Sequence, residues 1–321
     1  MASAPHPTLV VGAPGPLTGL VMHAWLDAGQ PIVAFLHATP PRGWREDRLL
    51  AWLRPRLSAT AALRRAGLEA EEAPRGRTTA AILAALDRSG ATLLLSAGFG
   101  RRIRPEVLAR LPGRAVNLHP ALLPAYRGPA PSLAMLRDDA YASAGGATLH
   151  LMDEGFDTGP LIAQRRLAAP APTDALGYRV ASAVAAAALA AEALPAYLDG
   201  RIVPTPQPAE GGPEARASPA DFLVGPEWDA ARIRRLAAAL PWTDRLLLPG
   251  PDGRAVPVAG RPRFLPAGAP PAPFGHLQAP CAEGIVRFRR WGVWDKRWWR
   301  ARRLLRQALL PLPPPGPEGG G

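Results

Sequence analysis

The stretch TLLLSAGFGRRIRPEVLARLPGRAVNLHP, residues 92–120, holds two apolar runs separated by a short segment. The first run, 92–96, ends in Ala-Gly-Phe-Gly, and the second, 115–118, ends at Pro120. Short apolar runs bounded by Gly and Pro are typical of buried strands. Pro at the start of the intervening segment favours a short helix over 105–111. The stretch therefore predicts a strand–helix–strand unit.

The residues before this unit repeat the same alternation. Apolar runs at 8–12 and 32–37 predict two more buried strands, and a helix over 17–28 is expected to end at Gly29. Capping residues and glycines predict two further helices, at 58–65 and 78–86. Strands that alternate with helices indicate βαβ units and a mostly parallel sheet with helices on both faces. The prediction for this part of the chain is an α/β, Rossmann-like fold.

Two more strands and a long helix follow the unit. The strands are expected at 147–152 and 161–165, and the turn DEGFDTG lies between them. Thr173 opens an Ala-rich helix that runs to about Leu198. We expect the first domain to comprise residues 1–202.

The rest of the chain has a different composition. Residues 203–220 are rich in Pro, Gly and Ala and predict a linker. Residues 221–310 are expected to form a smaller, β-rich domain, and residues 311–321 a disordered tail. The elements expected in the smaller domain are a helix at 229–240, strand-like pieces at 255–258 and 285–288, and a helical stretch at 291–309.

Composition limits the protein class. The chain has 321 residues, which favours two domains, and a net charge of +12. A basic chain suits contact with nucleic acid, but a solvated basic surface is an equal alternative. The single cysteine, Cys281, excludes an internal disulfide and suits a reducing compartment. The longest apolar run, 181–194, is too short to span a bilayer, and the first residues do not form a signal peptide, so we expect a cytoplasmic protein.

Polar residues fall where the predicted sheet should bind ligands, beyond the carboxyl ends of its strands. Asn117 and His119 are two residues apart on one strand and therefore share a face. Asp157 lies in the Gly-flanked turn between the two later strands. An amide and an imidazole can stabilise an oxyanion, and a carboxylate beside the imidazole can move a proton, so this set suits acyl transfer to an amine. Each residue alone is more often structural, and the histidines show no metal-ligand spacing.

Two motifs carry a resemblance to a known family. NLHPALLPAYRGPAPSLAML (117–136) and MDEGFDTGPLI (152–162) resemble the central motifs of the folate-dependent formyltransferases, in the same order and spacing. The resemblance implies the formyltransferase fold, 10-formyltetrahydrofolate as donor, and Asn117, His119 and Asp157 as catalytic residues. It implies as folate-binding residues Phe99, Gly100, Asp153, Glu154, Gly155 and Phe156. It implies as acceptor-binding residues Leu123, Pro124, Tyr126, Arg127 and Gly128.

Other stretches resemble the branch of this family that formylates initiator methionyl-tRNA. They are IVPTPQ (202–207) and WDAARIRRLAAALPW (228–242). The resemblance implies tRNA as a partner, an OB-like barrel in the second domain, and a basic loop, here 39–56, whose Arg42 and Arg45 would contact the tRNA. The barrel region looks strand-poor, so we expect it to be degenerate. Alternatives are a small amine acceptor such as a nucleotide-linked amino sugar, hydrolysis of the donor to formate, and a non-catalytic RNA-binding protein.

The run RFRRWGVWDKRWWRARRLLR (287–306) combines Trp and Arg. Trp291, Trp294 and Trp298 have the spacing of one helix face. Packing of this face on the rest of the domain is one interpretation. Stacking on RNA with phosphate contacts from Arg297, Arg300 and Arg303 is another, and contact with a membrane surface is a third.

Overall fold

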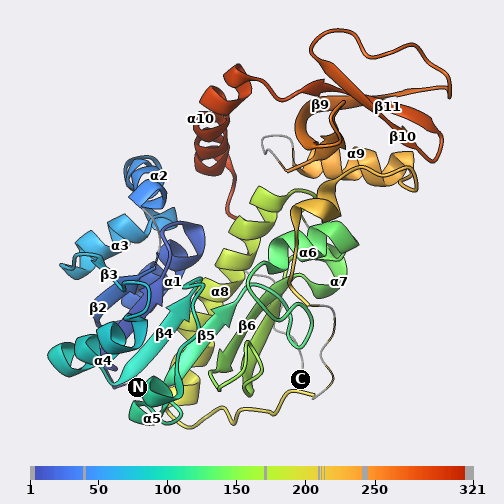
Figure 1. Cartoon of the computed structure of the whole chain (residues 1–321). Coiled ribbons are helices and arrows are strands. Elements are labelled where there is room, and N and C mark those ends of the chain that lie inside the picture. Colours follow the sequence, from blue (N-terminus) through green and yellow to red (C-terminus); the bar gives the residue numbers. More distant parts are fainter. Residues whose placement is uncertain are drawn as a thin grey trace.

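The computed structural model describes residues 4–38, 41–169, 172–208, 210, 212, 214–240 and 245–314; the side chains of 41, 42, 293, 294, 296–300 and 303 lie outside this description. A seven-stranded sheet in the order β3-β2-β1-β4-β5-β6-β7 forms the first part (Figure 1). Its strands are β1 (Thr8–Gly12), β2 (Ile32–His37), β3 (Glu71–Glu72), β4 (Leu93–Ala97), β5 (Ala115–His119), β6 (Gly146–Leu151) and β7 (Leu161–Arg166). Strands β1 to β5 pair in parallel, whereas β6 and β7 are antiparallel. The predicted mostly parallel α/β sheet is confirmed.

Helices cover both faces of this sheet, which explains the uninterrupted apolar runs of β1 and β4, whose residues are all buried. One face packs against α1 (Pro16–Asp27), α3 (Ala59–Ala66) and α8 (Ala175–Leu198). The other packs against α4 (Thr78–Ser89) and α5 (Pro105–Arg110). Helix α8 is apolar and long enough to cross a membrane, yet 67% of its most apolar window is buried inside the protein. Its composition therefore fits a core helix.

The prediction of a basic loop at 39–56 is wrong. Helix α2 (Pro41–Leu53) and a 3₁₀ turn, η1 (Pro55–Leu57), occupy most of it. Trp44 packs edge-on against Phe35 and His37 at the end of β2. The buried Asp47 carboxylate accepts hydrogen bonds from the Ser58 hydroxyl and the Thr60 N–H. These contacts with distant residues fix the helix, and none of them is visible in the local sequence.

The second part is richer in strands than its sequence predicted. Its four-stranded antiparallel sheet has the order β10-β11-β9-β8. The strands are β8 (Leu247–Pro249), β9 (Ala255–Leu265), β10 (His276–Cys281) and β11 (Gly284–Arg290). The two strands absent from the prediction, β8 and β10, are the edge strands and carry Pro249 and Pro280, and proline is tolerated at sheet edges. The β-rich character of this part is confirmed.

The two parts share a hydrophobic core. Helices α6 (Pro131–Asp138) and α7 (Tyr141–Ala144) follow β5 and form one buried cluster with α9 (Ala230–Ala239) and the small sheet. Ala215, in the predicted linker, is fully buried in the same cluster. The segment between the two parts is thus packed against the first part rather than extended away from it.

The last helix, α10 (Val293–Leu309), returns to the first part (Figure 1). Arg306 pairs with Asp174 at 2.8 Å, and the Arg54 guanidinium donates to the Ala308 carbonyl at 2.7 Å. Trp291 precedes the helix and is buried, as the packing interpretation expected for that residue. The side chains of Trp294, Trp298 and the predicted phosphate contacts Arg297, Arg300 and Arg303 lie outside the described residues.

Candidate active site

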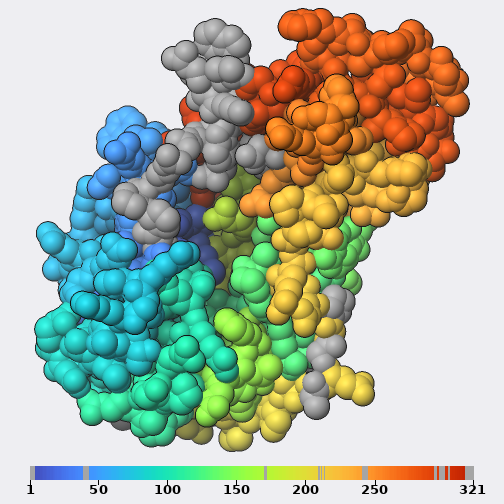
Figure 2. Space-filling model, in the orientation of Figure 1, coloured from blue at the N-terminus to red at the C-terminus, as the bar shows by residue number. Residues whose placement is uncertain are grey.

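A pocket lies at the carboxyl edge of β4 and β5, where the predicted sheet was expected to bind its ligand. The surface is hollowed between the blue-to-cyan N-terminal segments and the green and yellow segments that follow (Figure 2). The pocket is lined by β4 and β5, by the loop that follows β4, and by the turn between β6 and β7. Among its lining residues are Ser96, Phe99, Asn117, His119, Met152 and Asp157.

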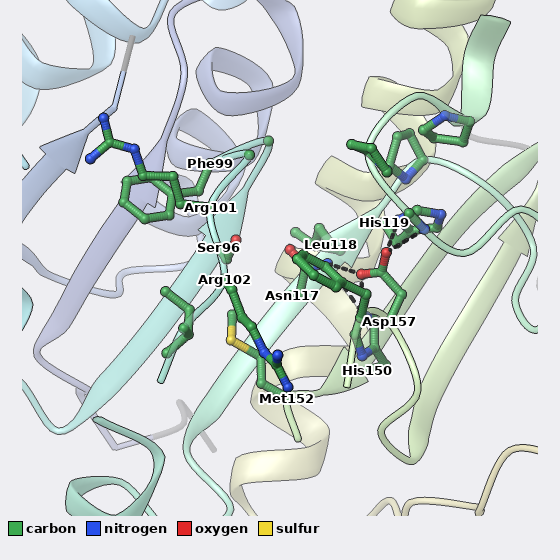
Figure 3. Close-up of a pocket in the computed structure, with 18 of the residues that line it drawn as sticks. Ser96, Phe99, Arg101, Arg102, Asn117, Leu118, His119, His150, Met152 and Asp157 are labelled. Carbon is green, nitrogen blue, oxygen red and sulfur yellow. Dashed lines mark hydrogen bonds and ion pairs between the residues drawn. The ribbon is translucent and has the colours of Figure 1, made fainter. Parts of the chain in front are cut away.

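The three predicted catalytic residues meet at one carboxylate (Figure 3). Asn117 Nδ2 donates to Asp157 Oδ1 at 3.1 Å, and His119 Nδ1 lies 3.3 Å from Asp157 Oδ2. The backbone N–H of Gly128 donates to the same Oδ2 at 2.9 Å. Asp157 has a φ of 56°, a left-handed conformation that is uncommon for a residue with a side chain. The surrounding contacts must hold this turn in place.

The His119 ring is buried, and its orientation follows from its two neighbours. Nε2 lies 2.8 Å from the Tyr126 carbonyl oxygen. A carbonyl can only accept, so Nε2 carries a proton and Nδ1 is the nitrogen that faces Asp157. The ring is therefore placed to exchange a proton with Asp157.

A second histidine, His150, belongs to the same cluster and was not predicted. It stands directly opposite Asn117 in the β5–β6 pairing. Its Nε2 lies 3.1 Å from Asn117 Nδ2 and 3.4 Å from Asp157 Oδ1, and its Nδ1 donates to the Leu151 carbonyl at 2.7 Å. His150 thus fixes the amide of Asn117, with both amide N–H groups directed at His150 and Asp157.

The pKa values of both titratable groups of the trio are lowered, which favours a neutral His119 and an ionised Asp157 at neutral pH. Burial lowers the pKa of His119, against the opposing effect of Asp157, and favours the neutral ring. Burial alone would raise the pKa of Asp157, but contacts with His150, His119 and the Gly128 N–H outweigh burial and bring the pKa to about 2. A neutral imidazole beside a carboxylate forms a pair that can accept one proton.

The pH dependence of turnover should show this pair. We expect kcat to fall in acid with a midpoint below 6.5, the ordinary pKa of histidine, because the lowered pKa of His119 keeps the ring unprotonated to lower pH. The measurement is kcat against pH with donor and acceptor both saturating. A midpoint above 6.5 would contradict the assignment of His119 as part of the proton acceptor.

The predicted folate-binding residues line two walls of the pocket, the loop after β4 and the turn between β6 and β7, with one exception. Figure 3 shows Phe99 across the pocket from Asp157. The lining includes Phe99, Gly100, Asp153, Gly155 and Phe156, but not Glu154. The carbonyl of Glu154 accepts a hydrogen bond from Arg102. Apolar side chains on one side and polar groups on the other suit a flat heteroaromatic ring with a reactive substituent.

Of the predicted acceptor-binding residues in the loop after β5, Gly128 lines the pocket, whereas the other four lie outside its lining. Leu123 and Tyr126 are buried, and the Tyr126 backbone carbonyl accepts the hydrogen bond from His119 Nε2. Pro124 follows a cis peptide bond in the same loop, and Arg127 is bound to Gln207. Arg45 is exposed on α2, and the side chain of Arg42 lies outside the described residues.

The α/β sheet and this site define an enzyme fold of the formyltransferase class, and comparison with known proteins agrees. A family model described as formyl transferase matches residues 56–188. The methionyl-tRNA formyltransferase of Paraburkholderia xenovorans is 32% identical over 267 residues, covering 78% of this chain and 75% of that protein. The chain belongs to the formyl transferase family, and the resemblance inferred from its motifs is confirmed.

Other comparisons cover less of the relatives or show the fold alone. The methionyl-tRNA formyltransferase of Myxococcus xanthus is 39% identical over 156 residues, covering 44% of this chain. That match spans 46% of the relative, so the chain aligns with about half the length of this group of relatives. A sugar N-formyltransferase structure from a Shewanella species has a TM-score of 0.58 at 17% identity, covering 81% of this chain and 99% of its own.

Proposed function

We propose that the protein transfers the formyl group of 10-formyltetrahydrofolate to an amine. The observation that supports this most is the Asp157 carboxylate, which contacts Asn117 and His119 at the edge of the pocket. Donor folate would bind between Phe99 and the turn that begins at Asp153, with its formyl carbon toward Asn117.

In the proposed reaction the acceptor nitrogen attacks the formyl carbon, and the carbonyl oxygen becomes an oxyanion. The attacking nitrogen gives its proton to the Asp157–His119 pair. The oxyanion then collapses, the bond from the formyl carbon to the folate nitrogen breaks, and the pair returns the proton to that nitrogen. The products are the formylated amine and tetrahydrofolate, so atoms and charges balance.

The role of Asn117 in this reaction follows from its hydrogen bonds. Both of its N–H groups are directed at acceptors, His150 Nε2 and Asp157 Oδ1. When Asp157 takes up the proton, its oxygen becomes a weaker acceptor. One amide N–H is then available to the oxyanion as negative charge develops there, and such a donor is typically worth about 100- to 1,000-fold in rate.

We propose methionyl-tRNA as the acceptor, supported by the relatives of that name and by exposed arginines on α2. Arg45 and Arg48 are exposed there. One observation favours a small amine instead. The segment expected to enter the tRNA acceptor stem forms α2, which Trp44 and Asp47 fix to the body of the protein.

Salt dependence distinguishes these acceptors. Each phosphate neutralised by an arginine steepens the log–log fall of binding with salt by roughly 0.7 to 0.9. Binding of initiator methionyl-tRNA should therefore weaken steeply with salt, and charge reversal at Arg45 and Arg48 should reduce the slope without changing folate binding. The measurement is tRNA affinity across a salt series, together with formyl transfer to the tRNA and to a panel of small amines. Weak, salt-independent tRNA binding with transfer to a small amine would overturn the tRNA assignment.

A further inference from the structure

The segment that follows α8 packs along the catalytic turn. Figure 1 shows it, in yellow, running from the end of α8 along the lower edge of the sheet. Thr205 and Leu161 exchange two backbone hydrogen bonds, at 2.7 and 2.8 Å. The residues at 203–208 are therefore held beside the start of β7, just after the turn that contains Asp157.

One side chain of this segment, Gln207, joins two separate loops of the site. Its Nε2 donates to the backbone carbonyls of Asp157, at 2.9 Å, and Gly159, at 2.6 Å. Its Oε1 accepts from Nε and Nη2 of Arg127, at 3.1 and 2.8 Å. Both N–H groups and both lone pairs of the amide are used, so the side chain is fixed at each end.

The two loops that Gln207 joins also hydrogen-bond to each other: one supplies the donor, and the other supplies the catalytic carboxylate that accepts. Arg127 precedes Gly128, whose N–H donates to Asp157 Oδ2. Asp157 itself has the left-handed φ of 56° and needs external contacts to keep it. By contrast, the folate side of the same turn is held internally, because Asp153 accepts from the Gly155 N–H and the Thr158 hydroxyl.

We propose that Gln207 is a positioning residue that sets the Asp157 carboxylate against His119. The proposal rests on the proposed formyl transfer, because it assigns Asp157 and His119 to the proton-transfer step. Gln207 contacts backbone carbonyls and a guanidinium rather than the pocket, so it acts through Asp157 and not on the substrate.

The separation of the two halves of the turn predicts a specific kinetic signature. Loss of Gln207 should leave the Asp153 wall of the folate pocket intact and move the Asp157 carboxylate. A displacement on the order of 1 Å at a reacting group can cost about 100-fold in rate. The KM for the donor should change little, while kcat should fall by about 100-fold.

The test uses two substitutions and a matched control from the same segment. Gln207→Ala removes all four hydrogen bonds. Gln207→Glu keeps an acceptor for Arg127 but cannot donate to the two carbonyls, so it should lower kcat as well. Thr205→Ala changes a neighbouring exposed side chain, keeps the backbone pairing with Leu161, and should behave as the wild type.

A second readout separates positioning from simple loss of stability. Asp157 raises the pKa of His119, so a displaced carboxylate should lower that pKa further. The acid midpoint of kcat, and the His119 titration followed by NMR, should both move to lower pH in the Gln207 variants. Folded Gln207→Ala and Gln207→Glu proteins with wild-type kcat and an unshifted His119 titration would overturn the proposal.

The NMR titration also keeps this proposal distinct from the proposed function. If the wild-type protein transfers no formyl group, the proposed function fails, and the shift of the His119 titration still decides whether Gln207 positions Asp157. If the wild type is active and the titration does not move on loss of Gln207, only the positioning role fails.

Discussion

Replacing Asp157 with asparagine is expected to lower turnover by about 100- to 10,000-fold, the range that a positioned general acid–base group supplies. The substitution nearly preserves the shape of the side chain but removes the charge that lies 3.3 Å from His119 Nδ1. The amide cannot take a proton from the attacking amine, so the reaction loses its proton acceptor. The measurement is kcat for formyl transfer, with donor affinity determined separately by equilibrium binding.

The control for this substitution is Glu106→Gln, which neutralises an exposed carboxylate at the start of α5. It should leave turnover unchanged. An Asp157→Asn protein with turnover close to wild type would remove the carboxylate from the proton-transfer step. A large loss of donor affinity with an unchanged kcat would instead assign Asp157 to folate binding.

The second large effect is expected for Asn117→Ala, which should lower turnover by about 100- to 1,000-fold through the loss of an oxyanion donor. Folate affinity should change much less, because in the proposed complex the donor's rings lie between Phe99 and the turn that begins at Asp153. His119→Ala should give a loss of similar size, since it removes the ring that shares the proton with Asp157. These values come from kcat and from donor dissociation constants measured on the same preparations.

The matched comparison for Asn117 is Asn117→Asp. It keeps the size of the side chain but replaces its N–H donors with oxygen beside the ionised Asp157. If the amide acts as a donor, this variant should be as slow as Asn117→Ala. Activity near wild type in either variant would show that the oxyanion is stabilised by other groups.

The sequence predicted the sheet and the catalytic cluster because both depend on local patterns. Buried strands such as β1 and β4 read as short apolar runs, and Asn117 and His119 share a face because they are two residues apart on β5. The position of Asp157 followed from a motif rather than from geometry, and the structure brings it to the other two residues.

The features that were not predicted depend on pairing between distant segments. His150 is opposite Asn117 only because β5 pairs with β6 in one register, and the alternation in GATLHL was the one available signal. Helix α2 forms where Trp44 and Asp47 find partners on other elements. Gln207 lies in a segment whose Pro and Gly content suggested a linker, although Thr205 of that segment pairs with Leu161 of β7 and Ala215 hydrogen-bonds to the Arg127 carbonyl.

The central claim is that the Asp157–His119 pair takes a proton from an amine as the amine receives the formyl group. The most direct test is a single-turnover reaction with 10-formyltetrahydrofolate labelled in its formyl carbon, with and without acceptor, in wild-type protein and in Asp157→Asn. The account predicts that the label moves to the amine nitrogen in the wild type, that consumption of the donor requires the amine, and that Asp157→Asn slows this step while still binding the donor. Release of the label as formate at the same rate with and without amine would contradict it and indicate a hydrolase.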